Sequence, residues 1–282
     1  MDKGLGVRAR DTERDHLAAW HAPQGTRVFK FVQFNMQFGQ RWDDLEPDLA
    51  PVDLDLTIAE MRAQQADIIV LQELEQAQPG GIQPDPPPNY TRLRSALTDY
   101  DSFFSYPKPD PRELPFGIGL AIFSRTPLRE LMRRDLPSPP IEFEFRGEKR
   151  TPTDRLLIGA KTTLGGRDLR VFNTHLLAFF MLNASCEEYR HQRELVVKEL
   201  GASDGPTLVA GDFNVHRHEP LVRQFAEAGY RAVQTEEVTW RRRPYVLDHI
   251  FYSPQLRLLR HAVEHTPASD HHLLAAEFEF ID

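Results

Sequence analysis

The stretch Thr207-Leu-Val-Ala-Gly-Asp-Phe-Asn214 joins an apolar run to a polar end. Residues 207–210 are predicted to form a strand that is buried on both faces. Residues two apart on an extended chain point to the same side, so Asp212 and Asn214 can face one reacting centre. Gly211 lets the backbone or a ligand come close. A carboxylate that takes a proton, beside an amide that donates to an oxyanion, suits hydrolysis of a phosphate ester.

The same layout recurs at five other predicted strand ends. In layered α/β proteins, ligands gather where strands emerge from the core. Most of the polar residues at these ends carry oxygen, and hard oxygen ligands suit Mg²⁺ or Mn²⁺ rather than zinc. The residues at these five ends are Asn35, Glu73, His175, Asp248 with His249, and Asp270 with His271.

Predicted strands and helices alternate along the chain. The strands are 28–34, 67–71, 119–123, 156–163, 169–173, 207–210, 245–252 and 273–280, and the helices are 54–65, 89–97, 185–200 and 219–228. Interleaved elements joined by loops favour one α/β domain. We therefore expect a domain over residues 26–282, preceded by an extension over 1–25 with a short helix near 13–20.

The composition narrows the class of protein. The 282 residues are 40% hydrophobic, enough for one large core, and the net charge of −8 is not that of a protein that coats nucleic acid. A single cysteine, Cys186, excludes an intrachain disulfide and a Cys-based zinc site. The longest apolar run, 176–182, is too short to span a bilayer, and the N-terminus does not look like a signal peptide. We expect a cytoplasmic protein without stable membrane insertion.

Taken together, six motifs resemble the endonuclease/exonuclease/phosphatase superfamily. Each motif alone is unspecific, but six in this order and spacing are a strong signal. The resemblance implies a four-layer α/β sandwich, with two mixed β-sheets packed face to face and helices outside, and metal-dependent hydrolysis of a phosphate ester. The motifs are Gln33-Phe-Asn35, Leu71-Gln-Glu73, Asn173-Thr-His175-Leu, Gly211-Asp-Phe-Asn214, Leu247-Asp-His-Ile250 and Ser269-Asp-His271.

The resemblance also implies a metal site and a water-activating group. Glu73 looks like the principal metal ligand, supported by Asn35, and Asp270 resembles a residue near the metal. Asp212 resembles the residue that orients or deprotonates the attacking water. Asn214 resembles the donor to the developing phosphoryl charge.

The remaining motifs imply roles for two histidines, His271 and His175. Asp248 and His271 look like the family's Asp–His pair, in which the carboxylate fixes the imidazole tautomer and raises its proton affinity. His271 would then contact the phosphate or donate a proton. His175 matches the members whose fourth motif reads Thr-His, which implies a role in catalysis or substrate binding. The DNA-repair nucleases of the superfamily use a tyrosine in this region, and its lack here weakens an abasic-site nuclease assignment.

The substrate stays open between several phosphate esters. Nucleic acid is the first expectation, because Arg241-Arg-Arg243 precedes the Asp248 motif and can meet phosphates, although a solvated charge run is the default for such a cluster. A phospholipid or sphingomyelin-like head group is second, supported by His175 and the apolar run 176–182. An inositol-phosphate-type phosphomonoester is third, and a non-catalytic binding protein on the same scaffold is the remaining alternative.

Other polar residues have structural explanations of their own. His216 and His218 are expected in a loop beside the cleft, while His249 and His272 should point away from it because they alternate with the motif residues. Solvent exposure is favoured for Gln192 on the predicted helix 185–200.

Overall fold

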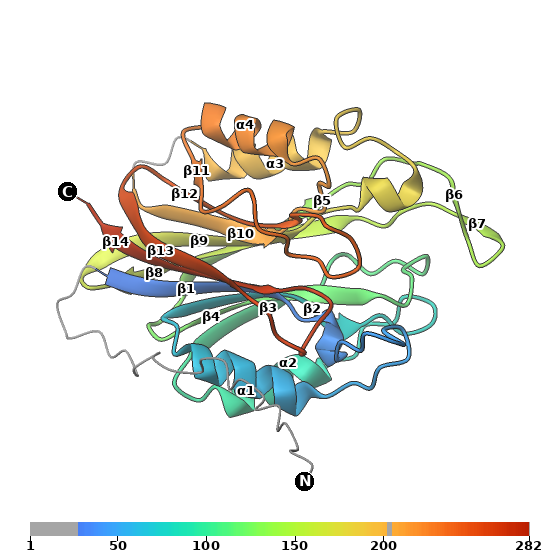
Figure 1. The fold of residues 1–282 in the computed structure, drawn as a ribbon, viewed down its shortest axis with the longest axis horizontal. Coiled ribbons are helices and arrows are strands. Elements are labelled where there is room, and N and C mark those ends of the chain that lie inside the picture. Colours follow the sequence, from blue (N-terminus) through green and yellow to red (C-terminus); the bar gives the residue numbers. More distant parts are fainter. Residues whose placement is uncertain (1–27, 202–204, 282) are drawn as a thin grey trace, which may run out of the picture.

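Two six-stranded β-sheets pack face to face, and helices cover both outer faces (Figure 1). The computed structural model describes residues 28–201 and 205–281. The predicted extension 1–25 and its short helix lie outside the described residues. The observed layers confirm the predicted α/β sandwich.

The first sheet has the strand order β13-β14-β1-β2-β4-β3. Its only parallel pair is β1–β2, and the other neighbours are antiparallel. The strands are β1 (Val28–Asn35), β2 (Ile68–Gln76), β3 (Asp101–Ser105), β4 (Gly117–Ser124), β13 (Leu256–Glu264) and β14 (Leu273–Phe280).

The second sheet repeats this pattern with the order β11-β12-β10-β9-β8-β5. Its only parallel pair, β9–β10, again lies in the middle. The strands are β5 (Arg129–Leu136), β8 (Arg155–Leu164), β9 (Arg167–His175), β10 (Thr207–Asp212), β11 (Arg231–Ala232) and β12 (Asp248–Tyr252). A separate hairpin joins β6 (Phe143–Phe145) to β7 (Glu148–Arg150).

Within residues 28–201 and 205–281, four α-helices form the outer layers. Helices α1 (Leu54–Gln64) and α2 (Pro88–Ala96) cover the first sheet, and α3 (His191–Leu200) and α4 (Glu219–Glu227) cover the second (Figure 1). Two short 3-10 turns, η1 (Gln37–Gly39) and η2 (Phe179–Leu182), follow β1 and β9. None of the helices in the described ranges has the length and apolarity needed to cross a membrane.

The apolar residues divide into three cores that match these layers. The central core lies between the sheets, and one further core lies under each helical layer. Strands β2 and β10 contribute to both sides of their sheets: Val70 faces the central core, while Ile69 packs under α1 and α2. Burial on both faces explains why these two strands read as continuous apolar runs.

The two central parallel pairs bring four strand ends to one edge of the sandwich. Strand β1 ends at Asn35, its pairing with β2 ends at Gln72 beside Glu73, and β9 and β10 end at His175 and Asp212. The ends from the two sheets touch, because the Asn35 amide lies 3.1 Å from an Asp212 carboxylate oxygen. This meeting point positions the candidate site.

One predicted helix was wrong at its start, and six strands were not predicted. The predicted helix 185–200 begins only at His191, because the chain first makes η2, ends it at Asn183 with φ of 52°, and then turns. Strands β3, β5, β6, β7, β11 and β13 were missed. β5 and β13 show why: they are edge strands in which most residues are exposed or half-buried, so polar residues interrupt their apolar alternation.

Gly211 is expected to tolerate no side chain. Its φ is +153°, and an added Cβ would lie 1.9 Å from the carbonyl oxygen of Thr174 on the neighbouring strand. Backbone atoms cannot move aside without breaking the β9–β10 pairing. We expect Gly211→Ala to lower the free energy of unfolding by about 3 kcal/mol or more, as measured by urea denaturation.

Gly166→Ala is the matched control for this change. Gly166 also has a positive φ, +78°, but an added Cβ would meet nothing within 4 Å. Gly166→Ala should lower the free energy of unfolding by about 1 kcal/mol, through backbone strain alone. Equal losses of stability in the two variants would contradict the steric explanation.

Candidate metal and phosphate site

Two carboxylates and one imidazole meet at the shared strand ends. His175 Nε2 lies 3.7 Å from Glu73 Oε1 and 3.6 Å from Asp212 Oδ2. The Asn35 amide stands between the two acids, donating to Glu73 at 2.9 Å and to Asp212 at 3.1 Å. Ligand atoms of Glu73, His175 and Asp212 all lie within 4.8 Å of one another, which is a suitable separation for one metal ion.

An irregularity in β2 turns Glu73 toward this centre. The pairing of β2 with β4 shifts between Gln72 and Glu75, and Glu73 itself has φ of 52°. Such a bulge re-aims a side chain at the rim of a sheet. Gly117 on β4 leaves the necessary room, because a Cβ there would lie 2.3 Å from Glu73 Oε2.

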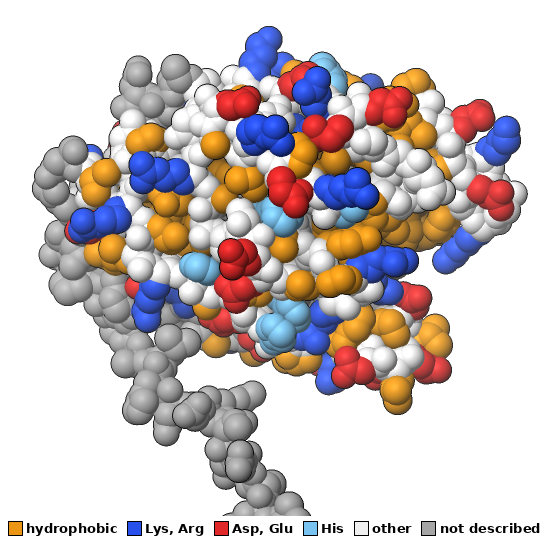
Figure 2. Space-filling view, turned by 45° about the horizontal axis from the view of Figure 1, so that its top comes forward, with side chains coloured by type: hydrophobic (Ala, Val, Ile, Leu, Met, Phe, Trp, Pro, Cys, Tyr) orange, Lys and Arg blue, Asp and Glu red, His pale blue; other side chains and the backbone are white. Residues whose placement is uncertain are grey.

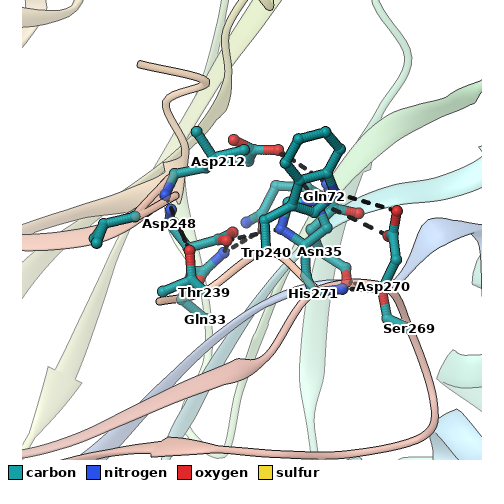
Figure 3. Close-up of polar contacts among 12 residues, drawn as sticks. Gln33, Asn35, Gln72, Asp212, Thr239, Trp240, Asp248, Ser269, Asp270 and His271 are labelled. Atoms are coloured by element: carbon teal, nitrogen blue, oxygen red, sulfur yellow. Dashed lines mark hydrogen bonds and ion pairs between the residues drawn. The ribbon is translucent and has the colours of Figure 1, made fainter. Parts of the chain in front are cut away.

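Asp248 and His271 form a second buried pair beside Asp212. His271 Nδ1 lies 2.7 Å from Asp248 Oδ2, and its Nε2 lies 3.7 Å from Asp212 Oδ2 (Figure 3). Burial alone would lower the pKa of His271, but the carboxylates of Asp248, Asp212 and Asp270 outweigh it and raise the pKa to about 10. His271 is therefore a cation whose free Nε2 faces the carboxylate cluster.

A chain of buried amides connects the two sheets under the site. Gln33 donates to Asp248 Oδ1 at 2.8 Å and to Gln72 at 2.7 Å (Figure 3). Gln72 in turn donates to Asn173 at 2.7 Å. Asn173 also donates to the carbonyls of Leu71 and Ala121. Both oxygens of Asp248 are thus occupied, by Gln33 and His271, which makes Asp248 a positioning carboxylate rather than a free ligand.

The carboxylates resist ionisation in the metal-free protein. Burial raises the pKa of Glu73 to about 7, against the hydrogen bond from Asn35. Burial, with the neighbouring Asp248 charge, also raises the pKa of Asp212 well above its usual range. A cation between these groups would offset both effects, because it stabilises the ionised forms. The donor set therefore fits a divalent ion.

Asn214 is placed beside Asp212, as the sequence predicts. Its backbone N–H donates to Asp212 Oδ1 at 2.9 Å, and its side-chain amide donates to the Leu176 carbonyl at 3.0 Å. Asn214 has φ of 53°, so the chain turns sharply after β10 and keeps the amide at the site. The carboxamide carries a second N–H that can donate to a ligand.

Asp270 lies at the edge of the same cluster. Its Oδ1 is 4.0 Å from His271 Nε2, and its Oδ2 accepts hydrogen bonds from Trp240 at 3.2 Å and Arg242 at 2.7 Å. The ligand roles inferred for Asn35 and Asp270 stay predictions. In this structure Asn35 Oδ1 accepts the N–H of Gln37, while Asp270 keeps one oxygen toward the site.

The sequence did not reveal two arginines that act on the site. Arg242 fixes Asp270, and it also pairs with Asp48 at 2.7 Å. Arg155, at the start of β8, lies near enough to add to the effect of burial and lower the pKa of His175 well below its usual range. Only chain folding brings Arg155 to the site. Arg242 belongs to the basic run 241–243, which the sequence predicts to meet phosphates rather than to hold Asp270.

Arg241 and Arg243 lie outside the carboxylate cluster. The Arg241 guanidinium donates to the Thr266 carbonyl at 2.6 Å, and Arg243 is exposed. The expectation for Gln192 was wrong: it is 2% exposed, because its amide satisfies the backbone of Leu177 and Leu136 beneath the loop after β9.

Aromatic rings border the site next to His271. The Phe180 ring lies 5.5–5.7 Å from those of His216, Trp240 and Tyr245, and Trp240 lies 6.3 Å from His271. All four rings of this aromatic group are partly exposed. The expected placement of His216 beside the cleft is consistent with this position. Partly exposed rings near a phosphate site offer a surface for a planar or apolar group of a substrate.

The fold is a two-sheet α/β sandwich with a cluster of carboxylates and imidazoles at one edge. The chain belongs to the Endonuclease/Exonuclease/phosphatase family, whose sequence profile matches residues 32–271. Members of this family are metal-dependent hydrolases of phosphate esters, and the acidic and histidine cluster agrees with that property.

Known relatives support the fold and leave the substrate open. A UPF0294 protein of Vibrio campbellii is 32% identical over 124 residues, which span 42% of each chain. An endonuclease/exonuclease/phosphatase of Beutenbergia cavernae superposes with a TM-score of 0.69 at 22% identity, covering 90% of this chain and 72% of that one. The human Nocturnin catalytic domain, solved with a bound sulfate anion, has a TM-score of 0.62 at 21% identity and coverages of 91% and 96%.

His249 is expected to make the fold acid-sensitive. As predicted, it points away from the site, where its ring stacks on Phe251. Burial, together with His218, lowers the pKa of His249 to about 3. A histidine whose pKa is depressed on folding contributes stability that is full above the unfolded value near 6.5 and is lost as the pH falls toward 3. Between pH 7 and pH 4.5, the free energy of unfolding of His249→Phe should therefore fall by about 2 kcal/mol less than that of wild type.

The measurement is the free energy of unfolding at both pH values, in chelator so that metal binding does not contribute. Exposed His191→Gln serves as the control, and it should follow the wild-type pH profile. If the stability of His249→Phe depended on pH as that of wild type does, His249 would not be the cause of the acid sensitivity.

Proposed function

We propose that the protein is a Mg²⁺-dependent phosphodiesterase, with Mn²⁺ as the alternative ion. One observation carries this proposal. Glu73, His175 and Asp212 lie together at one edge of the sandwich, with the Asp248–His271 pair beside them. Oxygen-rich donor sets suit Mg²⁺ and Mn²⁺. Glu73 would hold the ion with support from Asn35 and Asp270, and a bound ion would polarise a phosphoryl oxygen.

The residues of the chain supply the remaining parts of an in-line displacement. Asp212 orients the attacking water and accepts its proton, since one of its oxygens is fixed by the Asn214 backbone and the other faces the imidazoles. His271, held protonated by Asp248, contacts the phosphoryl oxygens or donates a proton to the leaving group. His175 and the second N–H of Asn214 stabilise the accumulating charge.

Nucleic acid is the substrate class that we favour. The aromatic group around Phe180 can stack on a base, and Arg241 and Arg243 lie beside Trp240 at its border. Side chains of both charges are interspersed over the face in Figure 2, so these arginines would act as a local contact rather than as part of a broad basic surface.

A phospholipid head group is the second candidate, for one observation. η2 follows His175 closely and leaves Met181 59% exposed next to the aromatic group. An apolar projection at this place could meet acyl chains. An inositol-phosphate-type phosphomonoester is the third candidate. A purely binding role is disfavoured, because binding alone does not need the Asp248–His271 pair.

A substrate panel tests these alternatives directly. Turnover is measured with Mg²⁺ on single-stranded DNA, duplex DNA, RNA, a choline phospholipid, an inositol phosphate and a generic aryl phosphodiester. Chelator should abolish every activity. Turnover of the lipid alone would overturn the nucleic-acid assignment, and no metal-dependent turnover of any ester would overturn the enzyme assignment.

A further inference from the structure

A surface hollow of about 760 Å³ adjoins the candidate site at Trp240 and Arg242. Its wall includes Arg241, Arg243 and His272, and none of the residues lining it belongs to the carboxylate cluster. His272 follows His271 directly, so the alternation of the extended chain sends one imidazole to the catalytic centre and the next to this hollow.

The arginines of the hollow are held in place before any ligand arrives. The guanidinium groups of Arg241 and Arg242 each lie 5.7 Å from the ring of Trp42. Arg242 is already committed to Asp270 and Asp48. The Arg241 side chain makes one hydrogen bond, to the Thr266 carbonyl, and its Nε is buried without a partner in the described structure. Arg241 is therefore an oriented donor with unused hydrogen-bonding capacity.

A pair of stacked histidines forms another part of the wall. The rings of His265 and His272 lie 3.8 Å apart and nearly parallel. His272 is 5% exposed, and its Nδ1 has no hydrogen-bond partner among the residues that the structure describes. An unsatisfied buried imidazole nitrogen costs free energy, and such atoms in native proteins commonly mark a ligand or water site.

The acids that line the hollow are engaged locally. Asp44 accepts the Trp42 indole N–H at 2.6 Å, and Glu237 pairs with His261 at 3.1 Å. Among the residues that line the hollow, the three arginines Arg241, Arg242 and Arg243 outnumber the two acids, Asp44 and Glu237. The hollow combines excess positive charge with fixed N–H donors, which is the chemistry that recognises a tetrahedral oxyanion.

We propose that this hollow binds a second phosphate group of the substrate, next to the phosphate that is hydrolysed. The assignment to the substrate rests on the proposed phosphodiesterase function, whereas the oxyanion site itself does not. A free inorganic phosphate has the same chemistry, so the experiment separates the two sources.

Calorimetric titration of inorganic phosphate into the metal-free protein tests the site without any reaction. The protein is kept free of metal so that no bound ion contributes to phosphate binding at the carboxylate cluster. We expect one phosphate per chain, with affinity about tenfold weaker in Arg243→Gln, whose exposed position leaves the fold intact, and weaker still in Arg241→Gln. The exposed Arg223→Gln is the charge-matched control and should bind as wild type does.

His271→Gln distinguishes the hollow from the catalytic centre. It should keep phosphate affinity, since His271 does not line the hollow. Weaker binding in His271→Gln, equal affinity in Arg243→Gln and Arg223→Gln, or no binding by wild type would each overturn the proposal.

Kinetics with Mg²⁺ identify the source of the phosphate. The p-nitrophenyl ester of thymidine 5′-phosphate is compared with the same ester carrying a 3′-phosphate. We expect wild type to favour the second by about tenfold in kcat/KM, through a lower KM, and Arg243→Gln to lose that preference. Equal rates in wild type would overturn the substrate assignment and leave a site for free phosphate. No hydrolysis of either ester would count against the phosphodiesterase function, while the phosphate titration would still decide the site.

Discussion

Asp212→Asn is expected to lower kcat by at least about 10³-fold while the fold stays intact. The change removes the proton acceptor for the attacking water, and general-base contributions reach 10²–10⁴. Asparagine keeps nearly the same shape, so its oxygen can still accept the Asn214 N–H that now reaches Asp212 Oδ1. Steady-state hydrolysis of an aryl phosphodiester with saturating Mg²⁺ is the measurement.

The stability of the same variant provides an independent check. The raised pKa of Asp212 means that folding favours its protonated form, so its contribution is present at low pH and is lost as the pH rises through the folded value. In chelator at pH 8, Asp212→Asn should therefore be at least as stable as wild type. Asp55→Asn, an exposed acid on α1 that pairs with Arg92, is the control and should retain full activity. Near wild-type turnover in Asp212→Asn would contradict the proposed mechanism.

Glu73→Gln is expected to weaken Mg²⁺ binding by about a hundredfold or more, and to abolish activity at moderate Mg²⁺. Even groups that only support metal ligands typically contribute 10–100-fold to affinity, and Glu73 is the inferred principal ligand. Glutamine can keep the hydrogen bond from Asn35 through its oxygen, so a loss of Mg²⁺ affinity results from removing the carboxylate charge. Calorimetric titration with Mg²⁺ measures the change.

Glu75→Gln is the matched control for this variant. It removes the same charge two residues along β2, where the carboxylate accepts the Tyr90 N–H in the first turn of α2. Its Mg²⁺ affinity should equal that of wild type. A parallel loss in both variants would show that β2 had been disturbed and would remove Glu73 from the metal site.

The candidate site shows why some of its parts were predictable. Asp212 and Asn214 follow an apolar strand closely, and Asp248 and His271 stand in short motifs beside strands. Such local signals survive in the sequence because strand alternation and burial act over a few residues. Predictions built on them named Glu73, His175, Asp212, Asp248 and His271, which the structure brings together at one edge of the sandwich.

Other parts of the site depend on contacts between distant segments. Arg155 approaches His175 only because β8 pairs with β9, and Arg242 reaches Asp270 only because residues 240–241 run beside 270–271. The amide chain from Asp248 through Gln33 and Gln72 to Asn173 crosses from one sheet to the other. No pattern within a window of sequence encodes such pairings.

The sequence by itself determined the class of fold, the order of the six motifs and the chemistry of their side chains, because periodicity and residue type are local properties. The tertiary structure decided where Glu73 points, which carboxylate is free to act and which is occupied, and that His272 opens onto a hollow beside the site. These features depend on a β-bulge, on hydrogen bonds between sheets and on burial. Each arises only when segments that are far apart in the chain pack against one another and exclude water.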